Sequence, residues 1–204
     1  KKYSDRQEFL DNYGDETYVK MKTIGLIGGM SWESSIEYYR IINEEVKRKL
    51  GGFHSAKCIM YSFDFAELEK LEQGMEWKEL TKIIIDAAQI LEKAEAELLV
   101  ICANTEHIMA DEIQKKIGIP LLNIIDTTAE KIKEDGLKKV CLLGTKFTME
   151  GDFYKERLIK KHDIGVIIPD EKERQIIHDV IYKELCIGII KKSSKDQFKK
   201  IIEN

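Results

Sequence analysis

The sequence predicts an α/β protein made of two similar doubly wound domains, each with a parallel sheet, and a cleft between them. From Thr23 onward, short β-branched runs alternate with longer segments in which apolar residues recur at the helical period. The chain has 204 residues, a length that suits one large domain or two small ones. A break is expected near the middle, at Ile119-Pro120-Leu121, because proline cannot continue a helix and is tolerated at the first residue of a strand.

The alternation predicts the individual elements in chain order. Strands are expected at Thr23–Ile27, Lys57–Phe63, Leu98–Cys102, Leu121–Ile124, Lys139–Gly144 and Gly165–Ile168. Helices are expected at Trp32–Leu50, Glu76–Lys93, Ala110–Ile117, Thr128–Asp135, Met149–Lys161, Glu171–Leu185 and Ser194–Glu203.

The break divides the chain into a first α/β domain, residues 21–119, and a second α/β domain, residues 120–204. The second domain is expected to be incomplete at its C-terminus, because a helix in such a protein usually leads into another strand. Residues 1–20 hold nine charges and little periodicity, and they are interpreted as an N-terminal extension of unknown role.

Composition and charge exclude several classes of protein. A net charge of -4 without a basic block makes nucleic acid an unsuitable partner. The sequence contains neither an apolar run of membrane-spanning length nor the apolar core of a signal peptide, so we expect a cytoplasmic protein without a membrane partner. Its four cysteines form no CxxC pair, which argues against a zinc site and a disulfide framework.

The loop after the first strand is a candidate ligand-binding segment. Gly29 and Met30 lie where ligands gather in open α/β sheets, at the carboxyl end of a strand and just before a long helix. Glycine lets a ligand approach the backbone, and Ser31 or Ser34 can cap the helix. The simpler alternative is a tight strand-to-helix turn.

Two further strand ends carry polar groups. The third strand runs into Cys102-Ala103-Asn104-Thr105-Glu106-His107, and we expect Asn104 and Thr105 to bind a small ligand. Strand alternation and an apolar run favour a buried, structural Cys102 over a catalytic one. In the second half, Thr145 and Thr148 follow another strand, where either can cap a helix and also contact a carboxylate.

Several segments together resemble the aspartate/glutamate racemase family, closest to its broad-specificity or L-aspartate/glutamate-type members. The resemblance is carried, in order, by IGLIGGMSWESS, EYYRIINEEV, HSAKCIMYSFDF, CANTEH, LLGTKFTMEGDFY and IYKELCIG. It implies an amino-acid racemase that needs no pyridoxal phosphate, other cofactor or metal, and that commonly forms homodimers. It also implies substrate contacts at Gly29, Met30, Asn104, Thr105, Thr145 and Thr148.

The resemblance also implies two acid/base residues, usually cysteines, on opposite faces of the substrate. The first family cysteine stands immediately before Asn-Thr, a position that is Ala103 here, so Cys102 is the neighbouring candidate. The second belongs to a Gly-Cys-Thr-Glu segment, which would lie beyond Asn204. A basic residue that some aspartate racemases use falls near Cys186 and is not matched in type. We therefore expect the 204-residue chain itself to racemise aspartate and glutamate poorly.

Three functions follow from these observations. The leading one is an amino-acid racemase that inverts the α-carbon by cofactor-independent proton transfer. The alternatives are a related cysteine-based isomerase or decarboxylase of a small carboxylic acid, and a ligand-binding relative that lost catalysis through Ala103.

Overall fold

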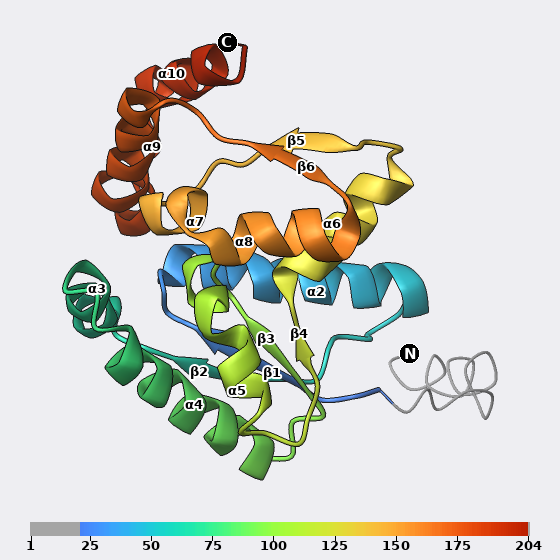
Figure 1. The fold of residues 1–204 in the computed structure, drawn as a ribbon. Helices are drawn as coiled ribbons and strands as arrows, with labels where there is room; N and C mark the ends of the chain where they lie inside the picture. Colours follow the sequence, from blue (N-terminus) through green and yellow to red (C-terminus); the bar gives the residue numbers. More distant parts are fainter. Residues whose placement is uncertain (1–20, 204) are drawn as a thin grey trace.

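Two parallel sheets, one above the other in Figure 1, organise the chain. The computed structural model describes residues 21–203, so the N-terminal extension expected at residues 1–20 lies outside the described part. The first sheet has the strand order β2-β1-β3-β4 and the second pairs β5 with β6. All the pairings are parallel, which confirms the predicted α/β class.

The first sheet is built from short strands with helices between them. Its strands are β1 (Ile24–Gly28), β2 (Cys58–Ser62), β3 (Leu98–Ile101) and β4 (Leu121–Leu122). The helices that connect them are α2 (Trp32–Leu50), α3 (Phe65–Gln73), α4 (Trp77–Lys93), η1 (Thr105–Met109) and α5 (Ala110–Gln114). Because the strands run parallel, the carboxyl ends of β1 and β3 meet at one edge of the sheet.

The second sheet has fewer strands and more helical cover. It contains β5 (Lys139–Cys141) and β6 (Gly165–Ile167). The surrounding helices are α6 (Ile124–Glu134), α7 (Lys146–Glu150), α8 (Asp152–Glu156), η2 (Arg157–Lys161), α9 (Glu171–Lys183), η3 (Leu185–Ile187) and α10 (Lys192–Glu203). In Figure 1, α9 and α10 flank this sheet on one side.

A separate apolar core supports each sheet. On the first sheet, Ile27, Leu99 and Ile101 pack with Leu80 and Ile84 from α4, and all five are buried. The second core contains Ile125, Ala129, Tyr154, Leu158 and Ile164. Burying a large aliphatic side chain contributes roughly 1.5–3 kcal/mol, so these cores hold the strand ends in fixed positions.

Most expected elements are present, and the differences have local causes. Helix α6 begins at Ile124 and not at Thr128, because the Asn123 side chain caps it by accepting a hydrogen bond from the Ile125 amide at 2.9 Å. The strand expected at Leu121–Ile124 is therefore only two residues long. It pairs with β3, which places Leu121 and Leu122 in the first sheet.

Two helical segments also differ from expectation. Helix α3 was not expected; Asp64 caps it by accepting a hydrogen bond from the Ala66 amide at 3.1 Å. The single helix expected at Met149–Lys161 is interrupted at Gly151, whose backbone is extended, so α7 and α8 are separate.

A membrane-spanning helix is not found among residues 21–203, because none of their helices is both long and apolar enough.

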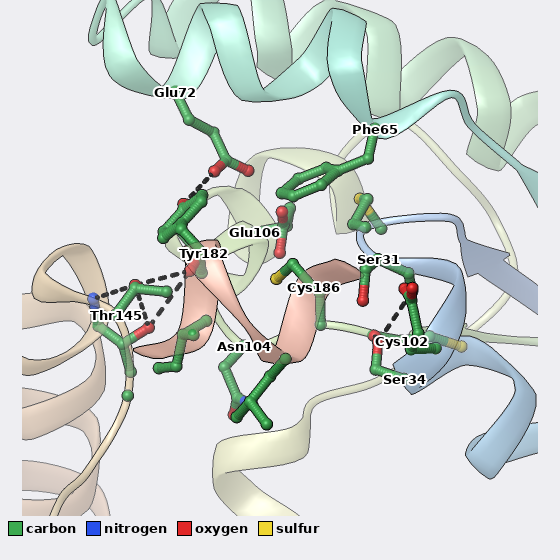
Figure 2. A pocket seen from close by; sticks show the side chains of 18 of the residues that line it. Ser31, Ser34, Phe65, Glu72, Cys102, Asn104, Glu106, Thr145, Tyr182 and Cys186 are labelled. Atoms are coloured by element: carbon green, nitrogen blue, oxygen red, sulfur yellow. Dashed lines mark hydrogen bonds between the residues drawn. The ribbon is translucent and has the colours of Figure 1, made fainter. Parts of the chain in front are cut away.

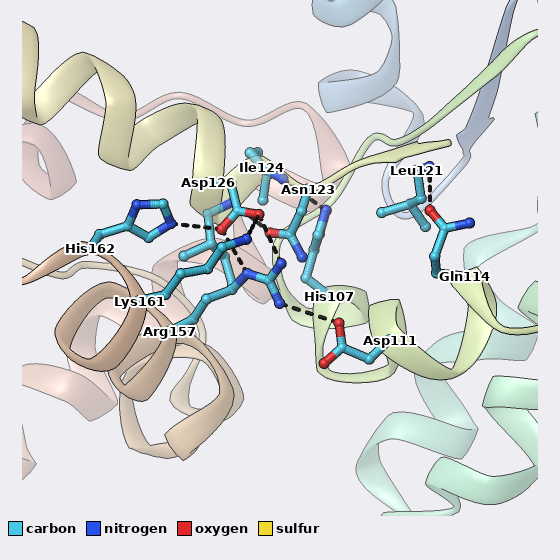
Figure 3. Close-up of polar contacts among 11 residues, drawn as sticks. His107, Asp111, Gln114, Leu121, Asn123, Ile124, Asp126, Arg157, Lys161 and His162 are labelled. Atoms are coloured by element: carbon cyan, nitrogen blue, oxygen red, sulfur yellow. Dashed lines mark hydrogen bonds and ion pairs between the residues drawn. The ribbon is translucent and has the colours of Figure 1, made fainter. Parts of the chain in front are cut away.

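An ion cluster ties the two sheets together at the start of α6 (Figure 3). Both oxygens of Asp126 accept hydrogen bonds from Arg157, at 2.8 Å each, and Lys161 and His162 donate to the same carboxylate. These bonds, led by the one from Arg157, lower the pKa of Asp126. Arg157 also reaches Asp111 on α5 at 3.2 Å, which links η2 to the first domain.

His107 makes a second connection between the sheets (Figure 3). Its Nδ1 lies 2.8 Å from the Ala103 carbonyl and its Nε2 accepts a hydrogen bond from the Ile124 amide at 3.1 Å. The ring is buried, which lowers the pKa of His107 to about 4. A neutral ring with the proton on Nδ1 satisfies both contacts, so His107 has a structural role at the start of α6.

This geometry predicts a loss of stability in mild acid. The unfolded chain binds a proton at His107 below about pH 6.5, whereas the folded chain does so only near pH 4, so stability falls as the pH drops between these values. The loss is of the order of 3 kcal/mol. Urea unfolding at pH 4.5 and pH 7 should show it in the wild type and much less of it in His107→Gln. Equal pH dependence in both proteins would contradict the assignment.

Candidate active site

A cavity of about 380 Å³ lies between the two sheets and is closed on one side by α9 and η3 (Figure 2). It is lined by Met30, Ser31, Glu33, Ser34, Tyr38, Phe65, Glu72, Cys102, Ala103, Asn104, Thr105, Glu106, Gly144, Thr145, Thr148, Ile181, Tyr182, Leu185 and Cys186. The carboxyl ends of β1 and β3 and the segment after β5 therefore converge on one site, as expected from the sequence.

The turn after β1 forms one wall. Gly29 has a positive φ of 85°, and a Cβ atom there would lie 2.3 Å from the Phe63 carbonyl oxygen, so only glycine fits. Gly29 itself is not among the residues that line the cavity; Met30 and Ser31 are. The Ser34 hydroxyl donates to the Cys102 carbonyl at 3.2 Å, which ties the start of α2 to the end of β3.

Three threonine hydroxyls meet where the two domains face each other. Thr105 Oγ1 lies 3.0 Å from Thr145 Oγ1 and 3.3 Å from Thr148 Oγ1, and Thr145 and Thr148 are 3.2 Å apart. Thr145 also caps α7, because its Oγ1 accepts from the Thr148 amide. Together with Asn104, these hydroxyls place hydrogen-bond donors on one side of the cavity, where they can bind a carboxylate.

A pair of buried carboxyl groups lies at another part of the wall (Figure 2). Glu72 on α3 and Glu106 on η1 are 1% and 2% exposed. Burial, and then the nearby Glu72, raises the pKa of Glu106 well above its usual value. Burial also raises the pKa of Glu72. The protonated Glu106 donates a hydrogen bond to Glu72, so the pair holds a proton.

The second domain covers this pair with Tyr182 from α9. The Tyr182 hydroxyl donates to Glu72 Oε2 at 2.7 Å, and its ring stacks on Phe65 with 6.3 Å between ring centroids. Burial and the adjacent carboxyls raise the pKa of Tyr182, so it remains a hydrogen-bond donor.

The two cysteines in the cavity wall differ in accessibility. Cys102 is 0% exposed, and burial raises its pKa to about 12, which disfavours the thiolate near neutral pH. Cys186 is partly exposed and its sulfur points into the cavity in Figure 2. Burial raises the pKa of the Cys186 thiol, while a hydrogen bond from the Ser31 side chain acts in the opposite direction.

Six of the seven candidate residues from the sequence line this wall, all except Gly29: Met30, Cys102, Asn104, Thr105, Thr145 and Thr148. Sequence reasoning missed the carboxyl pair. Glu72 lies in a helix that was not expected, and Glu106 was noted only as part of the CANTEH segment. The sequence feature that could have indicated Glu106 is its place directly after a strand end that is rich in small polar residues.

The burial of Cys102 predicts slow thiol labelling. A maleimide or a dithiobisnitrobenzoate probe should modify Cys186 at least tenfold faster than Cys102 near neutral pH, because a buried thiol of high pKa forms little thiolate. Peptide mass mapping after short exposures measures both rates in the same sample. Fast labelling of Cys102 that an amino acid suppresses would instead support a catalytic role for Cys102.

The chain is similar to proteins of one known family. A family model described as Asp/Glu/Hydantoin racemase matches residues 27–204. The broad specificity amino-acid racemase RacX of Bacillus subtilis is 30% identical over 105 residues, which are 52% of this chain and 45% of the relative. The chain thus aligns with less than half of that curated relative.

Solved structures match over more of the chain. A putative Asp/Glu racemase from Yersinia pestis is 50% identical, with a TM-score of 0.81, over 90% of this chain and 80% of its own. An aspartate racemase homologue from Pyrococcus horikoshii is 38% identical, with a TM-score of 0.73, over 90% and 79% of the two chains. The chain therefore belongs to the Asp/Glu/hydantoin racemase family.

Proposed function

We propose that this protein is an amino-acid racemase that inverts the α-carbon by cofactor-independent proton transfer. One observation carries the proposal: hydroxyl donors that can bind a carboxylate share a single cavity with titratable carboxyl and thiol groups. The racemase names of the relatives described above support the same reaction class. Racemisation needs a base that takes the α-proton and an acid that returns a proton from the opposite face of the substrate.

In this proposal the hydroxyl side of the cavity holds the substrate's carboxylate. Asn104, Thr105, Thr145 and Thr148 bind the carboxylate, and Met30 closes the adjacent wall. Fixing the carboxylate orients the α-carbon and its proton toward a base, which is the main requirement for proton transfer.

Positions 102, 103 and 186 bear on the choice of acid/base residues. Cys102, the candidate from the sequence, is buried with a raised pKa, and Ala103 has no titratable group. The partly exposed Cys186 lies in the same cavity. A second candidate function, amino-acid binding without catalysis, is favoured by Ala103, which lines the cavity where the family resemblance implies an acid/base residue.

Solvent exchange separates these two functions. The full-length protein is incubated in deuterated water with a panel of L- and D-amino acids, and deuterium at the α-carbon is measured together with inversion. A racemase incorporates deuterium into at least one amino acid. Saturable binding without any exchange would contradict the proposed activity and support the binding function.

Restoring a titratable group at position 103 should accelerate the reaction. We expect Ala103→Cys to raise the rate of α-proton exchange by about 10²- to 10⁴-fold, the usual contribution of one general acid or base. Ala103→Ser is the matched control, because it adds a side chain of similar size that does not ionise near neutral pH. Equal rates in the two variants would show that position 103 does not face the α-carbon.

We also propose a homodimer in the cytoplasm. Trp32, Ile36 and Tyr39 form an apolar face on α2, with Trp32 62% exposed, and Met60 on the edge strand β2 continues it. An exposed apolar patch of this kind marks protein interaction sites, and sedimentation velocity measures the assembly. The four free cysteines suit a reducing compartment.

A further inference from the structure

Three carboxyl groups from three different elements line the cavity. Glu33 Oε2 on α2 is buried and no donor from the described residues reaches it, while the buried Glu72 Oε1 on α3 and Glu106 Oε2 on η1 have no partner there beyond the proton that the two carboxyls share. A buried acceptor without a donor is destabilising, and more so when it is charged. In the empty cavity, the proton held by Glu106 and Glu72 reduces this cost.

The charged side chains of the cavity wall are all acidic among the described residues. Among the described residues that line it there are three glutamates and no lysine, arginine or histidine. A substrate with a second carboxylate would meet these acidic groups without a compensating cation. An ammonium group would instead supply the donors that the carboxyl oxygens lack, and hydrogen bonds between charged partners are about twice as strong as neutral ones.

Aromatic rings flank the same carboxyls. Phe65 and Tyr182 stack on each other beside the carboxyl pair (Figure 2), and Tyr38 also lines the cavity. Aromatic faces attract cations and also pack well against the methylene groups of a long side chain. Acidic oxygens beside aromatic rings therefore suit an alkylammonium chain.

The carboxyl pair and Asn104 are separated in the view of Figure 2, where Glu72 and Glu106 lie above the Cys186 thiol and Asn104 lies below it. A substrate held by its carboxylate at Asn104 and the threonines would extend its side chain toward Glu72 and Glu106. The volume of about 380 Å³ is sufficient for a long side chain.

Resting on the function proposed above, we propose that Glu33, Glu72 and Glu106 form the side-chain recognition site for a basic amino acid, whose terminal ammonium group binds between the carboxyls. The ammonium group replaces the proton that Glu106 and Glu72 share, and this proton leaves to solvent when the substrate binds. Substrate selection in this protein thus favours a positive side chain and disfavours a second carboxylate.

The proposed site also links affinity to pH. Because the bound cation favours ionised carboxyls, the affinity for a basic amino acid should rise with pH above the usual glutamate range, whereas that for a neutral analogue should not. The titratable groups that face the pair are Glu69 on α3, Tyr182 on α9, Cys186 on η3, Glu33 and Tyr38 on α2, and Cys102 after β3.

Calorimetric titration of the full-length protein with lysine, norleucine and glutamate tests the proposal. Norleucine has nearly the same length as lysine but lacks the side-chain ammonium. We expect lysine to bind at least tenfold more tightly than norleucine and glutamate. In Glu72→Gln and Glu106→Gln the preference for lysine over norleucine should fall at least tenfold, and in Glu67→Gln, an exposed change of equal charge on α3, it should persist.

The outcomes distinguish this proposal from the proposed function. Norleucine or glutamate binding as tightly as lysine, with α-proton exchange still present, would overturn the recognition site but leave the racemase function intact. If the two glutamine variants lost affinity equally for lysine and norleucine, the carboxyls would bind the α-ammonium group, and the proposed side-chain recognition site would also be overturned. Absence of both binding and exchange for every amino acid would overturn both proposals.

Discussion

The hydrogen-bonded carboxyl pair of Glu72 and Glu106 is the constraint on which the cavity depends. A buried carboxyl is tolerated only when it is protonated or well paired, and here the two groups share a proton while Tyr182 donates to Glu72 at 2.7 Å. The pair joins α3, η1 and α9, and so holds the second domain against the first. The position of the pocket and its acidic character therefore have the same origin.

Other polar contacts also join the two domains. The three threonine hydroxyls bridge η1 and the start of α7, and the Asp126 cluster and His107 secure the start of α6. These groups are polar, whereas each sheet has its own apolar core. Aromatic contacts also join the two units, through Trp77 with Phe147 and Phe65 with Tyr182. The cavity left between two independently packed units can bind a small ligand.

Sequence patterns predicted the parts of this arrangement that depend on local periodicity. The strand ends at Met30 and Asn104 could be predicted because parallel strands of one sheet place their carboxyl ends at one edge, and Thr145 follows a strand of the second sheet at its own carboxyl end. Glu72 could not, since nothing near it in the sequence distinguishes a buried carboxyl from one on a solvated helix face. Its burial depends on Tyr182, 110 residues later in the chain. The early start of α6 at Ile124 was missed for a related reason, because the Asn123 cap and the His107 contact override the local strand pattern.

The shared proton is tested most directly by the stability of Glu106→Gln as a function of pH. The raised pKa of Glu106 means that its contribution to stability is complete below about pH 4.5 and is lost as the pH rises, because the unfolded chain then ionises while the folded chain stays protonated. The glutamine variant keeps a donor to Glu72 and has no proton to lose. Urea unfolding of the wild type and the variant between pH 4.5 and pH 8 should show a free-energy advantage of the variant that grows with pH. An advantage that stays constant, or a variant that becomes relatively less stable as the pH rises, would contradict a protonated Glu106 in the folded protein.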